Sequence, residues 1–192
     1  ERGWEVSVGA DSAGHAFEPR WEAGQSLAAK LCGMHMMDSC RIEKGFRHFG
    51  HDITCEDHVL EAGLGFAIKT DKPNFIGRDA VLRKKEVGLN MRLVQLKLTD
   101  PEMLLYHNET ILRDGKVVGY LSSGSYGHHL GAAIGLGYVP CKGETVVDLL
   151  SSTYEIDIAG TRVKSEVSLR PMYDPKSERV KKLAIMDQDG AN

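Results

Sequence analysis

The chain has 192 residues, of which 42% are hydrophobic, and this suffices for one large domain or two small ones with real cores. Its formal net charge is only −3 and its charges are interleaved, which argues against binding to nucleic acid or to an anionic membrane. The sequence has no apolar run of the roughly 20 residues that a membrane span needs, and its four cysteines lack C-x-x-C spacing, which predicts reduced thiols rather than a metal site.

The first part of the sequence predicts alternating strands and helices. Apolar and polar residues alternate over residues 4–8, which predicts a strand, and the Asp-Ser pair at 11–12 can cap a helix after it. A short apolar stretch at 27–31 predicts a second strand. Helical spacing over residues 34–43 predicts a second helix. This order is typical of α/β folds.

A long irregular segment follows the second predicted helix. Residues 46–61 are rich in His, Asp and Gly and show little periodicity, so we expect a loop, and loops of this length are usually functional. The loop returns to an apolar segment at 64–68. A short helix is predicted at 78–85, ended by Gly88, and we place the domain boundary near Gly88.

The second part changes to a period of two residues, which predicts strands. The pattern begins at Met91, and the Asp114-Gly115 dipeptide between two apolar runs is a strong hairpin signal. Further strands are predicted at 132–139, 145–149, 154–158 and 161–167. We therefore expect an α+β protein with a partial α/β domain (1–88), a small antiparallel β-barrel (89–180) and a flexible tail (181–192).

Several runs of residues resemble folate-dependent aminomethyltransferase domains. Residues 38–52 read DSCRIEKGFRHFGHD, which is similar to the family's R-L-E-K-G-Y-R-H-W-G-H-D stretch, and residues 60–64 (LEAGL) resemble its P-L-E-A-G-L. Residues 75–80 (FIGRDA) resemble F-I-G-R-E-A, and residues 115–124 resemble the G-x-x-V-G-x-x-x-S-G hairpin. The likeness extends from about residue 3 to residue 179, and it is greater to the modules of sarcosine and dimethylglycine dehydrogenases than to the glycine-cleavage T-protein.

The resemblance implies a function in one-carbon transfer. Members of the family hold tetrahydrofolate in a central channel, and the dehydrogenase-type members convert the carbon of an oxidised methylamine to 5,10-methylenetetrahydrofolate. It further implies an FAD-binding domain upstream, a methylated amine as substrate, and a location in the bacterial cytoplasm or the mitochondrial matrix. The family's catalytic aspartate belongs to an N-terminal segment not present here, so we expect the fragment alone to be inactive. A T-protein and a noncatalytic regulatory domain are the alternatives.

Five residues are candidates for contact with folate. By the resemblance, Glu5 in the Gly-Trp-Glu triplet accepts hydrogen bonds from the pterin, with Trp4 beside it, although alternation alone would place Glu5 on a solvent face. Met37 stands where the T-protein has arginine, and it either packs on the p-aminobenzoyl ring or fills core. Glu61 either lines the channel or orders its loop. Tyr126 either lies at the barrel rim or contacts the folate tail.

The most specific motif contains charged residues for which we predict a structural role. Arg41 and Glu43 are two residues apart, so on a helix they point in different directions and need separate partners. For Arg41 we favour a half-buried position that holds the loop over contact with a ligand. His48, His51 and Asp52 would suit a metal by residue type, but their glycine and aromatic neighbours are typical of a packed turn, so we predict no metal site.

Overall fold

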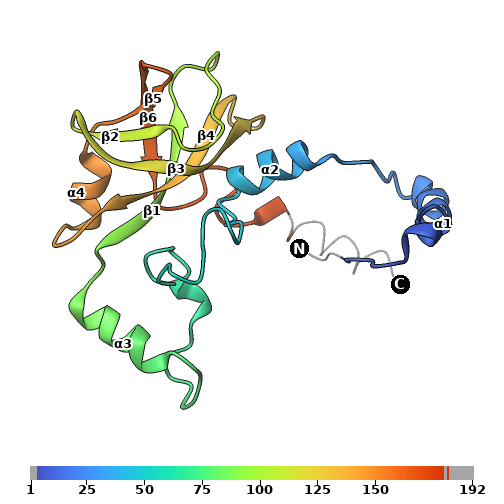
Figure 1. Ribbon diagram of the computed structural model, residues 1–192, viewed down its shortest axis with the longest axis horizontal. Coiled ribbons are helices and arrows are strands. Elements are labelled where there is room, and N and C mark those ends of the chain that lie inside the picture. Colours follow the sequence, from blue (N-terminus) through green and yellow to red (C-terminus); the bar gives the residue numbers. More distant parts are fainter. Residues whose placement is uncertain (1–3, 180, 182–192) are drawn as a thin grey trace. The chain divides into compact units, whose positions relative to one another are not determined.

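The computed structural model describes residues 4–179 and residue 181. It separates into two compact units, which we call the terminal unit (residues 1–37 and 179–192) and the barrel unit (residues 38–178). Figure 1 labels their helices and strands. In this described part of the chain, no helix is long and apolar enough to cross a membrane.

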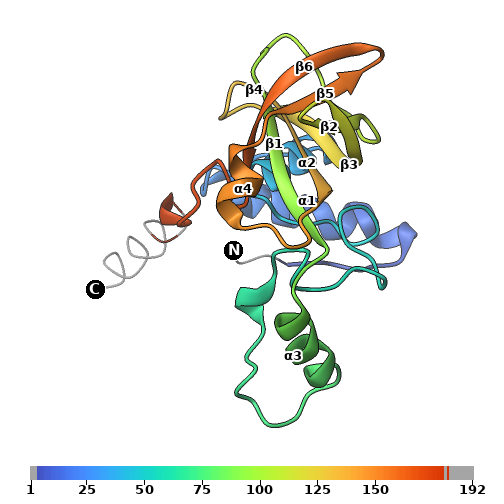
Figure 2. The ribbon, with the colours of Figure 1, turned by 90° about the vertical axis from the view of Figure 1, so that its left-hand side faces the viewer.

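Six antiparallel strands of the barrel unit close into a barrel, as predicted (Figures 1 and 2). Their order around the barrel is β1-β4-β3-β2-β5-β6, and pairing of β6 with β1 completes the closure. The strands are β1 (Met91–Leu98), β2 (Thr110–Arg113), β3 (Lys116–Gly127), β4 (Ala132–Pro140), β5 (Tyr154–Ile158) and β6 (Thr161–Ser168). Closure removes the unpaired edges that an open sheet would leave exposed.

The helices are short and lie mostly before the barrel in sequence. They are the 3-10 turns η1 (Ala10–Ser12) and η2 (Gly65–Ala67), and the α-helices α1 (Ala13–Gln25), α2 (Met34–Glu43), α3 (Arg78–Val87) and α4 (Val146–Ser151). The three helices predicted in the first part are confirmed as α1, α2 and α3, and Gly88 ends α3 with a φ of 90°. The predicted cap of α1 is wrong, because Asp11 and Ser12 belong to η1 and the Ser12 side chain makes no capping hydrogen bond.

Both faces of β1 are buried, and this places α2 against the barrel. Val94, Leu96 and Leu98 belong to the main core cluster of the barrel. Leu93 lies on the other face and belongs to a second cluster together with Ile42 of α2. Because successive side chains of a strand alternate between its faces, β1 packs on the barrel core with one face and on α2 with the other.

The predicted hairpin is confirmed. β2 and β3 pair antiparallel on either side of Asp114 and Gly115. These two residues have φ values of 50° and 76°, and a two-residue turn with both central residues at positive φ matches the twist of the strands it joins. The Asp-Gly sequence was therefore sufficient to locate this turn.

Three predicted strands are wrong. Residues 146–149 lie in α4, and Thr145 is its N-cap, since the Thr145 side chain and backbone exchange hydrogen bonds with Asp148 in a capping box. Residues 4–8 and 27–31 form no strand, since neither segment pairs with any other described residue in a ladder. Leu27 and Leu31 are instead 83% and 68% exposed. The flexible tail predicted at 181–192 falls outside the described residues, apart from residue 181.

Candidate functional site

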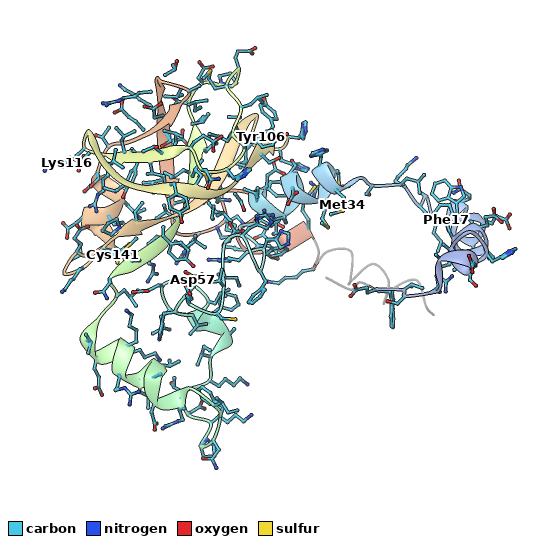
Figure 3. All side chains as sticks on the ribbon, viewed as in Figure 1. Phe17, Met34, Asp57, Tyr106, Lys116 and Cys141 are labelled. Atoms are coloured by element: carbon cyan, nitrogen blue, oxygen red, sulfur yellow. The ribbon has the colours of Figure 1, made fainter. Side chains whose placement is uncertain are left out.

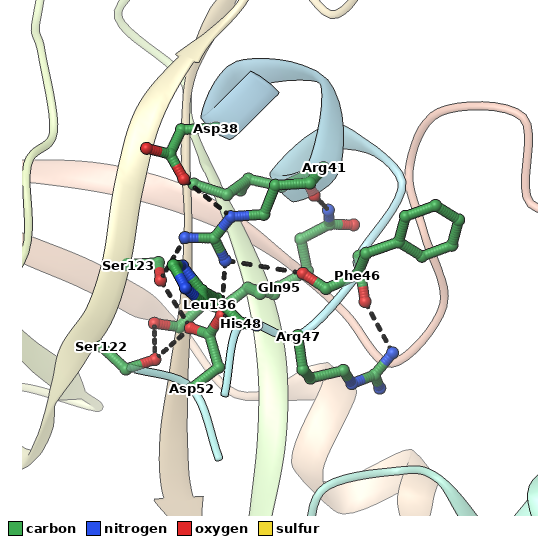
Figure 4. Close-up of polar contacts among 12 residues, drawn as sticks. Asp38, Arg41, Phe46, Arg47, His48, Asp52, Gln95, Ser122, Ser123 and Leu136 are labelled. Carbon is green, nitrogen blue, oxygen red and sulfur yellow. Dashed lines mark hydrogen bonds and ion pairs between the residues drawn. The ribbon is translucent and has the colours of Figure 1, made fainter. Parts of the chain in front are cut away.

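Arg41 of α2 contacts three side chains: Asp38 of the same helix, Asp52 of the following loop and Ser123 of β3 (Figure 4). Its Nε donates to Asp38 Oδ1 at 3.1 Å, and its Nη2 donates to Ser123 Oγ at 2.8 Å. Its Nη1 forms a short ion pair with Asp52, whose side chain is fully buried. Arg41 therefore holds the loop, as predicted: its Nη1 also donates to the carbonyl oxygen of Phe46 at 3.5 Å, and the buried Asp52 carboxylate is a further loop partner.

Asp52 is the centre of this polar network. Its Oδ1 accepts hydrogen bonds from Ser122 Oγ at 2.6 Å and from Ser123 Oγ at 2.7 Å. Its Oδ2 accepts from the backbone N–H of His48 at 2.8 Å and from Arg41. Four donors thus surround a carboxylate that has no exposed side-chain surface, which is how a buried charge is tolerated. The network ties the histidine-rich loop to both α2 and β3.

Glu43 forms a second buried connection between α2 and the barrel. Its side chain is 1% exposed, and its Oε1 accepts from the backbone N–H groups of His129 at 2.6 Å and Leu130 at 3.2 Å. Its Oε2 lies 2.8 Å from His129 Nδ1. Arg41 and Glu43 therefore have separate partners, as predicted. The motif with the clearest family resemblance serves here to dock a helix and a loop on the barrel.

A cavity of about 540 Å³ lies where this loop meets the barrel. Its lining is rich in acidic residues, namely Asp52, Glu56, Asp57 (labelled in Figure 3) and Glu61, and it also includes Tyr120 and Tyr138. We call it the acidic cavity. The Tyr138 hydroxyl is buried and has no hydrogen-bond partner among the described residues. Burial, reinforced by the charges of Asp57 and Asp52, raises the pKa of this hydroxyl, so it stays protonated and able to donate.

Glu61 anchors the start of β1 at the edge of the acidic cavity. Its Oε1 accepts from the backbone N–H groups of Asn90 at 2.8 Å and Met91 at 3.2 Å, and it lies 2.7 Å from Lys84 Nζ. Burial opposes ionisation of Glu61, but the hydrogen bonds from Lys84, Asn90 and Met91 outweigh it and lower the pKa of the carboxyl group. Glu61 thus orders the residues that lead into β1, which agrees with the loop-ordering role. It also lines the acidic cavity, so the role in lining a folate channel stays a prediction.

These contacts predict how stability depends on pH at Glu61. We expect Glu61→Gln to lower the free energy of unfolding by about 1–2 kcal/mol at pH 7, because charge-assisted bonds are lost. The pKa of Glu61 is lower in the folded state than in the unfolded state, where it is about 4.3, so ionised Glu61 stabilises the fold at pH values above about 4.3. This stabilisation is lost as the pH falls through the folded-state pKa. Urea unfolding at pH 7, 5 and 3 should show the difference from wild type shrinking toward acid. Exposed Glu102→Gln is the control, and a pH-independent difference would contradict the assignment.

The structure brings only one of the five predicted folate residues to the acidic cavity, namely Glu61. Tyr126 lies half-buried in β3 and packs against the barrel core. Its ring meets the His128 ring edge-on, with the two ring centroids 5.3 Å apart. Trp4, Glu5 and Met37 are exposed residues of the terminal unit, with Trp4 96% and Met37 47% exposed.

Sequence reasoning did not single out Tyr138 or Asp57, which the structure places in the acidic cavity. Tyr138 lies in β4, where almost every residue is buried, so its pattern resembled that of a core position. Asp57 lies in the irregular loop, where no periodicity of the sequence indicates whether a side chain points to solvent or to the interior. The signal that was available is the length of the loop itself, since long loops in compact domains tend to carry function.

Two family models match the chain. Residues 1–72 match the model described as the GCVT N-terminal domain. Residues 91–174 match the glycine cleavage T-protein C-terminal barrel domain, and this span contains all six strands of the barrel.

Curated proteins similar to the chain include oxidases, dehydrogenases and transferases. The 4-methylaminobutanoate oxidase (formaldehyde-forming) of Paenarthrobacter nicotinovorans is 43% identical over 182 residues, which cover 94% of this chain and 22% of the relative. Mitochondrial sarcosine dehydrogenase of Mus musculus is 33% identical over 94% of this chain and 20% of its own length. An aminomethyltransferase of Halothermothrix orenii is 39% identical over 72% of this chain and 39% of its own length. The chain spans about a fifth of the oxidase and the dehydrogenase.

A solved structure has the same fold. The glycine cleavage system aminomethyltransferase T from Bartonella henselae superposes with a TM-score of 0.72 at 22% identity, over 84% of this chain and 45% of that one. Because the N-terminal and the C-terminal domain models both match, the chain belongs to the glycine cleavage T-protein family.

Proposed function

We propose that the chain is the tetrahydrofolate-binding, one-carbon transfer module of a demethylating enzyme of the sarcosine or dimethylglycine dehydrogenase type. The observation that carries the proposal is that relatives named for N-methylated amines are similar over nearly the whole chain: 94% of it in the oxidase and in sarcosine dehydrogenase. We further propose that an FAD-binding domain elsewhere in the protein oxidises the amine. No catalytic residue is assigned to this chain.

The residues of the acidic cavity suit a reduced pterin. The pyrimidinone edge of a pterin presents N–H donors, which carboxylates accept in a fork geometry, and its ring oxygen accepts hydrogen bonds. Asp57 and Glu61 offer acceptors, and the unpartnered Tyr138 hydroxyl offers a donor. From the family resemblance alone, and independently of this cavity, we propose Glu5, Trp4 and Met37 as folate contacts. All three are exposed and therefore accessible to a ligand. Tyr126 is proposed as a contact of the folate tail.

In this proposal the chain positions tetrahydrofolate and shields the reacting groups from water. Bound tetrahydrofolate supplies two nitrogens, N5 and N10, as acceptors of the one-carbon unit. The side chains hold the pterin in one orientation toward the incoming carbon, which lowers the entropic cost of transfer. They also exclude water, which would otherwise hydrolyse an iminium to formaldehyde and amine. Because mitochondrial and bacterial relatives exist, we propose the mitochondrial matrix or the bacterial cytoplasm as the location.

The proposal predicts that Glu5→Gln weakens folate binding. We expect tetrahydrofolate, titrated into the full-length protein, to bind about tenfold more weakly to the variant, because one charge-assisted hydrogen bond to the pterin is lost. Exposed Glu18→Gln, in the same unit, is the matched control and should bind as wild type does. Equal affinity of Glu5→Gln and wild type would refute the Glu5 contact.

Two other functions are separable by experiment. The 39% identity to an aminomethyltransferase supports a T-protein, which would transfer an aminomethyl group from a carrier protein and would not oxidise sarcosine or dimethylglycine. Met37, in place of the arginine of that class, favours the dehydrogenase type. A noncatalytic regulatory domain would show no affinity for tetrahydrofolate in the full-length protein.

A further inference from the structure

Two neighbouring cavities of the barrel unit have linings in which every described charged residue is basic. The larger, of about 740 Å³, is lined by the cations Lys44, Arg47, Arg170 and Lys176, and the smaller, of about 430 Å³, by Lys84, Lys85 and Arg92. Gly63 and Phe66 line both cavities, so the two linings are continuous, and we call them together the basic surface. Because the whole chain has a net charge of only −3, composition does not explain this concentration of cations.

Two arginines of the basic surface make no ion pair with any residue that the structure describes. The Nε of Arg47 donates to the carbonyl oxygen of Ala62 at 2.9 Å and its Nη1 to that of Gly45 at 2.6 Å, and both acceptors are neutral. Arg92 Nε is buried and has no hydrogen-bond partner among the described residues. Burial lowers the pKa of Arg47, and the charge of Arg92 lowers it further. Such partly desolvated cations are stabilised by a carboxylate from outside.

Large apolar side chains are exposed within the same surface. Phe66 is 84% exposed and Phe46 is 45% exposed, and both line the larger cavity. Leu64 lines this cavity as well, and Leu89 lines the smaller one. Aromatic residues and arginine are enriched in the centres of protein–protein interfaces, and exposed apolar patches mark such interfaces. The composition of the basic surface therefore favours a protein as its partner.

Charge argues against two other occupants. A nucleic acid is bound through many unpaired cations along its backbone, but Lys44 and Lys84 are already paired with carboxylates. Lys44 Nζ lies 3.1 Å from Asp174 Oδ2, and Lys84 Nζ lies 2.7 Å from Glu61 Oε1. A second copy of the chain, in a twofold contact, would set the basic surface against itself, and the like charges would repel.

We propose that the basic surface is covered by another domain of the same polypeptide, which presents carboxylates to Arg47 and Arg92 and apolar side chains to Phe66. The proposal rests on the proposed function for its choice of partner, because it takes the chain to be one module of a larger enzyme. The oxidase and the sarcosine dehydrogenase that resemble the chain are longer, since it spans 22% and 20% of them. A tether within one polypeptide gives such a domain a high effective concentration at this surface.

A photoreactive side chain identifies the partner directly. Phe66→p-benzoylphenylalanine, made in the full-length protein, keeps an aromatic ring at the position. On illumination we expect crosslinks to an Asp- or Glu-containing peptide of the same polypeptide outside the present 192 residues, identified by mass spectrometry. The same label at Val117, which is 70% exposed and lies outside the basic surface, should not reach that peptide. No crosslink from position 66, or crosslinks only to a second copy or to a different protein, would overturn the inference.

Charge reversal tests the electrostatic part of the contact. In full-length Phe66→Cys, we expect a maleimide to label position 66 at least about tenfold more slowly in the folded protein than in urea, because the interface excludes the reagent. Adding Lys85→Glu, at an exposed lining position, should raise the folded-state rate severalfold, because its charge repels the carboxylates of the partner. Lys116→Glu, an equal change at an exposed position outside the surface, should not. Equal labelling in folded and unfolded protein, or equal effects of the two reversals, would contradict the proposal.

The outcomes separate this inference from the proposed function. Labelling and crosslinking are measured without folate, and tetrahydrofolate binding is measured on the same full-length protein. If tetrahydrofolate binds while position 66 is labelled freely, only the inference fails. If position 66 is covered by the same polypeptide while tetrahydrofolate does not bind, the inference stands and the proposed function fails.

Discussion

Asp52→Asn should lower the free energy of unfolding by about 3–5 kcal/mol, the largest effect that we expect of any single substitution in the chain. The variant keeps the shape of the side chain but removes its charge. Arg41, whose side chain is only 15% exposed, would lose its buried anionic partner and keep only Asp38, whose side chain is 39% exposed and lies 3.1 Å from Arg41 Nε. A carboxylate that water screens compensates a desolvated guanidinium far less than a buried one. Urea unfolding of wild type and variant at neutral pH measures the difference.

A surface ion pair provides the control for Asp52. Glu166, which is 60% exposed, lies 3.0 Å from Lys97 Nζ, and Glu166→Gln should cost less than about 1 kcal/mol because water already screens this pair. Equal losses for Asp52→Asn and Glu166→Gln would mean that Arg41 finds water or another acceptor. The central place of Asp52 in docking the loop would then be wrong.

Glu43→Ala should cost about 2–4 kcal/mol. Glu43 accepts two backbone N–H groups of the turn between β3 and β4, those of His129 and Leu130. Truncation would leave the His129 N–H without a partner, at a cost of about 1–3 kcal/mol for a buried group, and would leave the Leu130 N–H only its hydrogen bond to the Gly127 carbonyl oxygen at 3.1 Å. Glu43→Gln keeps one acceptor oxygen and should lose less than Glu43→Ala. Denaturant unfolding ranks the two variants.

A substitution of His129 separates the two functions of the Glu43 carboxylate. His129→Ala removes the contact of Nδ1 with Oε2 and the stacking of the imidazole on Tyr173, where the ring centroids are 4.2 Å apart. Because the His129 side chain is 45% exposed, we expect a loss of only about 1 kcal/mol. Hydrogen exchange in the β3–β4 turn should accelerate in Glu43→Ala and not in His129→Ala. If His129→Ala were the more damaging change, the backbone N–H groups would not be the principal partners of Glu43.

The local features of the chain were readable from its residues. Period-two alternation predicted the strands of the barrel, and the Asp114-Gly115 pair predicted the two-residue turn between β2 and β3, because both depend on residues that are neighbours in sequence. The helices at α1, α2 and α3 followed from spacing and glycine stops. The same reasoning failed at 145–149, because a short apolar run is compatible with either a strand or a helix. The Thr145–Asp148 capping box stabilises the helix.

The family resemblance could also be read from the sequence, but the contacts that the matching residues make could not. The residues of the motif at 38–52 showed that Arg41 and Glu43 need separate partners, yet those partners, Ser123 and His129, lie more than 80 positions away along the chain. Only closure of the barrel brings them to α2. The proposed folate contacts of Glu5, Trp4 and Met37 remain predictions.

Two cavities of the barrel unit have linings of opposite charge, and tertiary structure alone decided this separation. The acidic cavity contains Asp52, Glu56, Asp57 and Glu61, whereas the charged residues of the other are Lys44, Arg47, Arg170 and Lys176. In the sequence, Asp52 and Ile53 are adjacent, and acids and bases alternate with no visible segregation. The loop after α2 is held by the buried Asp52 network, and it divides a lining of carboxylates from a lining of cations. Local patterns specify turns, strands and helices because those depend on near neighbours. The electric character of a cavity depends on which distant side chains the folded backbone brings together.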